Sequence, residues 1–153
     1  MVNDEVIVKD MIFLDENLKE KESIIDFILN EAHAKRIISE VSELREAVIE
    51  RENEISTAIG YDIAMPHGKS DTVLQPFIAF LRTTADFNWT EENLETVRLV
   101  FLIAVPSENT DNMHLKFISQ ISKKLLDDEF REQLLIEKDN NKVYELLKSI
   151  QKN

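Results

Sequence analysis

Residues 98–106 have the sequence RLVFLIAVP, a nearly continuous apolar run. A run of this kind is typical of a strand that is covered on both faces, because a half-exposed strand alternates apolar and polar residues. A second strand is predicted at Phe77–Thr83, a third at Val6–Phe13, and a separate short extended segment at Phe87–Thr90. The run at residues 98–106 is therefore expected to lie in the middle of a sheet.

Helical periodicity occupies much of the remaining sequence. Apolar residues at helical spacing predict helices at Glu22–Ala34 and Ser39–Glu52. The C-terminal third is predicted to contain three helices, the last two near Asp128–Leu135 and Asn141–Ile150. The first of the three has an apolar stripe that is expected to face the core, formed by Leu115, Ile118, Ile121 and Leu125. Strands interleaved with helices predict an α/β (α+β) three-layer sandwich with a central sheet flanked by helices.

Length and charge restrict the domain organisation and the partners. The chain has 153 residues without an internal repeat or flexible linker, so residues 1–153 are predicted to form a single domain. The formal charge of −12 opposes binding to nucleic-acid phosphates or anionic lipid. No stretch approaches the roughly 18 apolar residues of a membrane span, and the N-terminus does not resemble a signal peptide. We expect a cytoplasmic protein with no nucleic-acid partner and no direct membrane insertion.

Several kinds of chemistry are excluded by the residues that are present. Cysteine is absent, which excludes disulfides, thiolate nucleophiles and thiolate zinc sites. The three histidines have no metal-ligand spacing, and no glycine-rich nucleotide-binding motif or serine-hydrolase motif occurs. The sequence therefore predicts neither a metal ion nor a cofactor.

His67 is the histidine with the most suggestive surroundings. Pro66 removes a ladder donor and favours extended geometry at the preceding residue, so a short strand is expected to end there with His67 just beyond it. A neutral imidazole is nucleophilic at physiological pH, and Gly68 beside it allows close approach of a ligand. The residues alone leave open the alternative of a strand-end histidine that is hydrogen-bonded to a carbonyl and has no function.

Two further residues are candidates only in combination with His67. His114 lies near the start of a predicted helix, where free backbone donors favour anions. Arg51 lies near the end of another. Each one alone is explained as an exposed charged or polar residue at a helix end. His33, within a predicted helix, is assigned no function.

The order of motifs resembles a known family. Arg51-Glu52 is followed by STAIG at residues 56–60 and IAMPHG at residues 63–68, and a His114-Leu115 pair opens a later helix. This series resembles the signature of the fructose/mannitol (type 2) IIA domains of the sugar phosphotransferase system, and the match covers nearly the whole chain. The resemblance implies the mixed-sheet fold of mannitol-type IIA proteins.

The resemblance also implies roles for particular residues. His67 corresponds to the histidine that accepts the phosphoryl group, through the nitrogen that the family pattern suggests is Nε2. Arg51 and His114 correspond to the family's active-site arginine and second histidine. Ser56 and Thr57 correspond to the Ser-Thr pair and are carried over as hydroxyls that line the site. Guanidinium, imidazole and helix-end amides suit phosphoryl transfer, which depends on positioning and charge stabilisation.

The implied function is that of a phosphocarrier. The family receives its phosphoryl group from phospho-HPr and passes it to a IIB domain, and it needs no metal or nucleotide. A regulatory, nitrogen-type IIA protein, whose phosphorylation state controls a target protein, is the alternative. A third possibility is a binding or structural module on the same fold.

The sequence departs from the family signature at three positions. Ala58 replaces the glycine of STG, Asp62 replaces a second glycine, and Met65 replaces a branched apolar residue. Asp62 adds a charge and a side chain five residues before His67. This change is expected to affect the geometry of the turn before His67.

Overall fold

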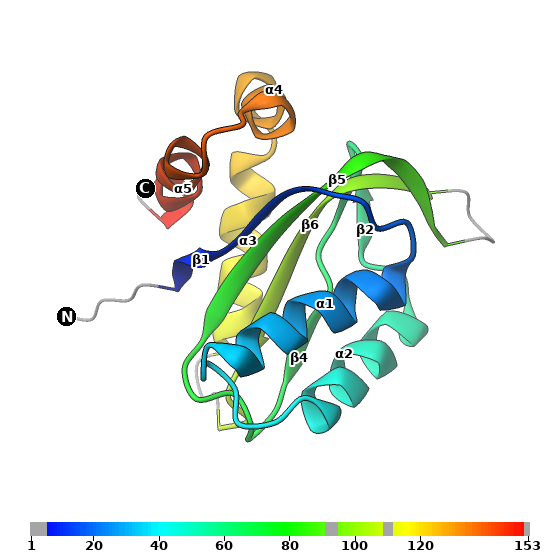
Figure 1. The fold of residues 1–153 in the computed structure, drawn as a ribbon, viewed down its shortest axis with the longest axis vertical. Helices are drawn as coiled ribbons and strands as arrows, with labels where there is room; N and C mark the ends of the chain where they lie inside the picture. Colours follow the sequence, from blue (N-terminus) through cyan, green and yellow to red (C-terminus); the bar gives the residue numbers. More distant parts are fainter. Residues whose placement is uncertain (1–5, 91–94, 109–111, 152–153) are drawn as a thin grey trace.

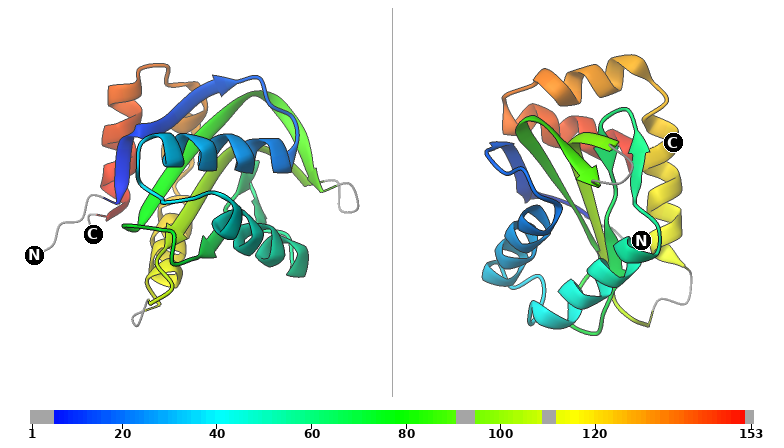
Figure 2. Two further views of the ribbon diagram at one scale, coloured as in Figure 1. Left: turned by 60° about the horizontal axis from the view of Figure 1, so that its bottom comes forward. Right: turned by 90° about the vertical axis from the view of Figure 1, so that its right-hand side faces the viewer.

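The computed structural model, which describes residues 6–90, 95–108 and 112–151, has helices on both faces of a sheet (Figure 1). Helices α1 (Lys21–Ala34) and α2 (Ser42–Glu54) pack on one face. The other face carries α3 (Met113–Lys124), α4 (Asp128–Ile136) and α5 (Asn140–Lys148), followed by the 3-10 turn η1 (Ser149–Gln151) (Figure 2). The predicted three-layer α/β sandwich is confirmed.

The sheet is mixed. Its strands are β1 (Ile7–Glu16), β2 (Ala58–Gly60), β3 (Ile63–Ala64), β4 (His67–Lys69), β5 (Phe77–Thr90) and β6 (Glu95–Val105). Their order is β1-β5-β6-β3-β2, and β4 also pairs with β6. Strands β5 and β6 are antiparallel, whereas β1 is parallel to β5 and both β3 and β4 are parallel to β6. Strand β6 is therefore central, as its apolar sequence predicted.

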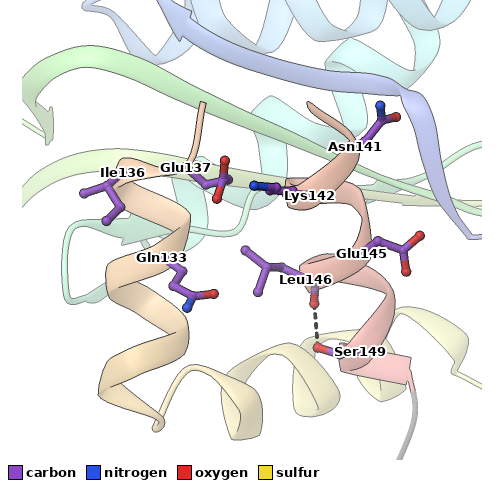
Figure 3. Close-up of a pocket in the computed structure, with 8 residues that line it drawn as sticks. All are labelled: Gln133, Ile136, Glu137, Asn141, Lys142, Glu145, Leu146 and Ser149. Atoms are coloured by element: carbon purple, nitrogen blue, oxygen red, sulfur yellow. Dashed lines mark hydrogen bonds between the residues drawn. The ribbon is translucent and has the colours of Figure 1, made fainter. Parts of the chain in front are cut away.

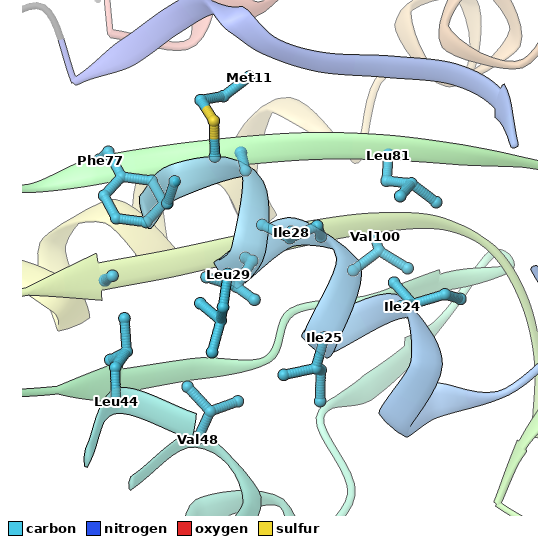
Figure 4. Close-up of a cluster of buried hydrophobic side chains, with 14 of the residues drawn as sticks. Met11, Ile24, Ile25, Ile28, Leu29, Leu44, Val48, Phe77, Leu81 and Val100 are labelled. Carbon is cyan, nitrogen blue, oxygen red and sulfur yellow. The ribbon is translucent and has the colours of Figure 1, made fainter. Parts of the chain in front are cut away.

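The side chains of β6 divide between two cores. Val100, Leu102 and Ala104 face α1 and α2, while Phe101 and Ile103 face the C-terminal helices. Figure 4 shows Val100 close to the isoleucines of α1 in the first core. Because successive residues of a strand point to opposite faces, a strand covered on both faces must be apolar at every position.

The hairpin of β5 and β6 is longer than predicted. Strand β5 runs without interruption from Phe77 to Thr90, whereas the sequence predicted a strand and a separate segment. The register with β6 shifts between Arg82 and Phe87, and the three residues 84–86 between the buried positions are exposed. A β-bulge absorbs extra residues without ending the strand. The exposed residues of the bulge resemble a loop in sequence, which is why the prediction was wrong.

The apolar stripe predicted for α3 is partly wrong. Leu115 is 52% exposed, and Phe117 is buried together with Ile121 and Leu125. Spacing alone allowed either face of the helix, and packing against the sheet selects the face that has the aromatic ring.

Gly68 lies where α2 crosses β4. A Cβ added to Gly68 would be 2.8 Å from Val48 Cγ2 and 3.1 Å from the Val48 backbone nitrogen. Valine on a helix is stiff at χ1, so the contact has little room to relax. Gly68→Ala is expected to lower the free energy of unfolding by about 1–3 kcal/mol in urea denaturation.

A compensating variant tests the cause of this effect. Gly68→Ala combined with Val48→Ala should be less destabilised than the sum of the two single variants, because the second change removes Cγ2 from the clash. Strict additivity would show that the two residues do not collide.

Candidate functional site

Pro66 divides one part of the sheet into two short strands. Strand β3 ends at Ala64, and β4 begins at His67, which pairs with Ile103 of β6. The Pro66 carbonyl accepts a hydrogen bond from the Ile103 N–H at 3.0 Å, so the pairing with β6 continues although proline has no donor. The expected short strand therefore does end before His67, but His67 is not a loop residue, since it is the first residue of β4.

The imidazole of His67 has a defined tautomer. Its Nδ1 lies 3.0 Å from the Met65 carbonyl oxygen. A carbonyl only accepts hydrogen bonds, so Nδ1 bears the proton and the neutral ring has its lone pair on Nε2. The hydrogen bond to the carbonyl is thus compatible with a nucleophilic histidine, because it occupies Nδ1 and leaves the lone pair on Nε2.

His114 lies beside His67. It is the second residue of α3, which follows Asn112 in a left-handed conformation at φ 50°. The ring centroids of His67 and His114 are 6.0 Å apart, with the planes inclined at 31°. Both side chains are half-buried. The fold therefore brings together two histidines that are 47 positions apart in the sequence.

Electrostatics favour the neutral form of both rings. Burial lowers the pKa of His67 below its ordinary value of 6.5, and the positive charge of Arg51 lowers it further. The bond to the Met65 carbonyl and the negative charge of Glu52 act in the opposite direction without reversing the shift. Burial, with the charges of Lys69 and His67, also lowers the pKa of His114. Two neutral imidazoles are expected at neutral pH.

The influence of Arg51 can be measured directly. Because its positive charge opposes protonation of His67, Arg51→Gln is expected to raise the pKa of His67 in an NMR titration of the ring protons. Arg45→Gln is the matched control, since Arg45 is also on α2 but is paired with Asp26 and Glu22. An equal change in both variants would show that the effect is general and not a property of the site.

Arg51 lies in the last turn of α2. Its guanidinium Nη1 donates a 2.8 Å hydrogen bond to the carbonyl of Ile55, just beyond the helix end. The side chain is half-buried, and its charge acts on His67. Arg51 is therefore close enough to His67 for its charge to act on that ring, and its guanidinium is held on one side by the Ile55 carbonyl.

The two predicted hydroxyl residues are engaged within the protein. Ser56 Oγ donates to Glu95 Oε1 at 2.8 Å and accepts from the Ala58 N–H at 3.1 Å. Thr57 is only 5% exposed, and its hydroxyl donates to Glu52. Their predicted role of lining the site stays a prediction.

Glu52 was not identified as a site residue by the sequence analysis. It is only 3% exposed and lies in the region of the histidines. The available signal is that Glu52 continues the buried stripe of Leu44 and Val48 at intervals of four residues. An acidic residue in such a stripe requires buried hydrogen-bond donors.

The turn before β3 accommodates Asp62. Gly60, Tyr61 and Asp62 all have positive φ values of 94°, 57° and 64°. Aspartate tolerates this conformation better than most side chains. Asp62 accepts a 2.8 Å hydrogen bond from the Thr96 hydroxyl, and its carbonyl accepts from the N–H groups of residues 98 and 99. The departure from the family signature is therefore compatible with a well-bonded turn.

A groove elsewhere on the surface lies between α4 and α5 (Figure 3). Its lining residues are Gln133, Ile136, Glu137, Asn141, Lys142, Glu145, Leu146 and Ser149. None of them belongs to α2, β4 or the start of α3. The groove is therefore separate from the two histidines. Among the described residues, no group of three or more His, Asp or Glu side chains could hold a metal ion.

Comparison with known proteins places the chain in a family. A family model described as "Phosphoenolpyruvate-dependent sugar phosphotransferase system, EIIA 2" matches residues 5–150. The fructose-specific EIIABC component of Bacillus subtilis is 32% identical over 143 residues, which cover 94% of this chain and 22% of that protein. The fructose-specific EIIA component of Haloferax volcanii is 30% identical over 141 residues, covering 92% of this chain and 91% of that one.

The solved structures that resemble this chain are also IIA proteins. The nitrogen regulatory protein IIA-Ntr from Neisseria meningitidis superposes with a TM-score of 0.83 at 26% identity, covering 94% of this chain and 97% of that chain. The complex of enzyme IIAMTL and phosphorylated enzyme IIBMTL from Escherichia coli contains a chain with a TM-score of 0.77 at 27% identity, covering 92% and 95%. The mannitol-type IIA fold is confirmed.

The class of protein is therefore a phosphotransferase component. The chain belongs to the EIIA 2 family of the phosphoenolpyruvate-dependent sugar phosphotransferase system. Its length corresponds to about a fifth of the B. subtilis component and to nearly all of the H. volcanii component. In the part of the chain that the structure describes, no helix is long and apolar enough to cross a membrane.

Proposed function

We propose that this chain accepts a phosphoryl group from phospho-HPr on Nε2 of His67 and passes it to a IIB component for sugar uptake. The observation that carries the proposal is the hydrogen bond from Nδ1 to the Met65 carbonyl. It leaves the lone pair on Nε2 of a neutral ring that has the His114 ring as a neighbour and is under the influence of the Arg51 charge.

The transfer step follows from this tautomer. The Nε2 lone pair attacks phosphorus, a P–N bond forms, and the P–N bond of the donor phosphohistidine breaks with its electron pair returning to the donor imidazole. Nδ1 keeps its proton throughout, and the Met65 carbonyl stabilises the positive charge that the ring acquires. No metal ion or nucleotide is needed for this step.

Arg51 and His114 are assigned to the phosphoryl oxygens. The guanidinium supplies positive charge and N–H donors, and the imidazole of His114 is next to the reacting ring. Ser56 and Thr57 shape the segment after α2 through their bonds to Glu95 and Glu52. In this proposal they line the site from that segment and contact no reacting atom in the unphosphorylated protein.

The partners are proposed from family relationships and surface properties. The solved E. coli complex pairs a similar IIA chain with phosphorylated IIB. Leu115, next to His114, is 52% exposed and offers an apolar contact for a transient partner. The net charge of −12 complements a basic docking face on HPr. The proposal further takes the chain to be a single cytoplasmic domain that binds no nucleic acid.

A regulatory role is the second candidate. The similarity to a nitrogen regulatory IIA protein, at a TM-score of 0.83, favours it. In that case His67 would be phosphorylated in the same way, and the phosphorylation state would control a target protein. The two roles differ in what happens after phosphorylation.

The test is incubation with enzyme I, HPr and phosphoenolpyruvate, followed by intact mass and fragmentation. An acid-labile gain of about 80 Da located at His67 is expected. Subsequent addition of a fructose-type IIB should remove the gain and phosphorylate IIB. Retention of the group in the presence of IIB would contradict the uptake role, and the lack of any gain with a working control IIA would contradict the phosphocarrier role.

A further inference from the structure

The carboxylate of Glu52 is buried in a cage of three donors. Oε2 accepts from the Thr57 N–H at 2.8 Å and from the Trp89 indole N–H at 2.7 Å, and Oε1 accepts from the Thr57 hydroxyl at 2.8 Å. Only 3% of the residue is exposed. Three donors directed at two oxygens are the pattern that an ionised carboxylate requires in a buried position.

These bonds connect three parts of the fold. Glu52 is in the last turn of α2, Thr57 is in the segment between α2 and β2, and Trp89 is near the end of β5. A second contact reinforces the connection, because Ser56 donates to Glu95 at the start of β6. The far end of the β5–β6 hairpin is thereby attached to the segment that follows α2.

Arg51 immediately precedes Glu52 in the same helical turn. The Arg51 guanidinium donates a hydrogen bond to the carbonyl of Ile55, which lies in the segment that Glu52 binds. Helix ends fray unless tertiary contacts hold them. The position of the Arg51 guanidinium relative to His67 therefore depends on the path of residues 52–57.

We propose that Glu52 is a positioning residue for phosphoryl transfer, which holds the end of α2 against Thr57 and Trp89 so that Arg51 stays beside His67. The inference rests on the proposed function of His67. A carboxylate serves this purpose better than an amide, because all three partners are donors and the NH2 group of a glutamine would face one of them.

The main test is a double-mutant cycle on the rate of phosphoryl uptake from phospho-HPr. Glu52→Gln is expected to lower kcat by roughly 10- to 100-fold with little change in KM, because Arg51 is displaced from the developing charge. In an Arg51→Ala background the same change should have little further effect. Glu50→Gln, an exposed change of equal charge one position before Arg51, is the control and should keep the wild-type rate.

Two further measurements separate positioning from simple support of the fold. Trp89 is the only tryptophan, so its fluorescence reports whether the cage has changed in the folded variant. The pKa of His67 in an NMR titration distinguishes the two effects of Glu52→Gln, because loss of the Glu52 charge alone would lower it, whereas displacement of the Arg51 charge, the larger of the two influences, raises it. The positioning role therefore predicts a raised pKa of His67 in folded Glu52→Gln, in the same direction as in Arg51→Gln. Loss of structure alone would not produce a folded protein with this shift.

The outcomes are distinct. If the wild-type protein takes up no phosphoryl group, the proposed function has failed. If the wild type is active and folded Glu52→Gln has the same kcat, the positioning role is overturned. The role is equally overturned if Glu52→Gln lowers kcat by the same factor in the Arg51→Ala background as in the wild-type background. Should Glu52→Gln not fold, Thr57→Val removes only the hydroxyl donor, and a smaller loss of kcat is expected. A wild-type rate in that variant would equally overturn the proposal.

Discussion

His67→Ala is expected to abolish phosphoryl uptake from phospho-HPr. The variant lacks the ring whose Nδ1 proton is engaged by the Met65 carbonyl and whose centroid lies 6.0 Å from that of His114. The acid-labile gain of about 80 Da seen in the wild type should be absent in intact mass spectra, whatever the incubation time.

The control for this prediction is His33→Ala. His33 is exposed near the end of α1, so the variant loses one imidazole without touching the site and should retain the full gain. Persistence of the gain in His67→Ala would contradict the assignment. It would transfer the acceptor role to His114, whose ring is 6.0 Å away.

Asp15→Asn is expected to destabilise the protein by about 3 kcal/mol in urea denaturation at neutral pH. Asp15 pairs with Arg82, whose side chain is 1% exposed and also donates to the Leu134 carbonyl at 2.8 Å. A guanidinium does not lose its proton, so the variant leaves a buried positive charge without a counter-charge. The 37% exposure of Asp15 allows water to compensate in part, which is why the lower end of the usual range applies.

The pH dependence and a matched pair test the explanation. The Arg82 hydrogen bond lowers the pKa of Asp15, so the carboxylate contributes stability above its ordinary pKa of 3.8. This contribution is lost as the pH falls through the lowered value, and wild type and variant should then converge. Asp26→Asn is the control, because Asp26 is 41% exposed but its partner Arg45 is 36% exposed. Its cost should stay below about 1 kcal/mol, and an equal cost for both variants would contradict the role of arginine burial.

The elements that the sequence predicted correctly depend on local pattern. Strand β6 was recognisable because seven successive apolar residues, from Leu99 to Val105, indicate burial on both faces. The predicted boundaries of α1 and α5 were close to those observed, since helical periodicity is a local property. The face of α3 was misjudged at Leu115, because the choice between two apolar faces is made by what packs against the helix.

The candidate site shows the same division. His67, His114 and Arg51 were suggested by order and spacing of motifs, and the structure brings the two histidines to 6.0 Å. The cage around Glu52 was not predicted, because its donors Thr57 and Trp89 come from segments up to 37 positions away. A hydrogen bond across such a distance depends on the path of the bulged β5–β6 hairpin.

The amino-acid sequence alone is sufficient for the class of fold and the central strand, because periodicity acts over a few neighbouring residues, and its resemblance to the family is what singles out His67 as the proposed acceptor. Only the tertiary structure decides the tautomer of His67, the lowered pKa values of the two histidines and the burial of Glu52 and Arg82. Burial and hydrogen bonding arise from segments that are distant in the chain. Their free energies exist only once the sheet has brought those segments together.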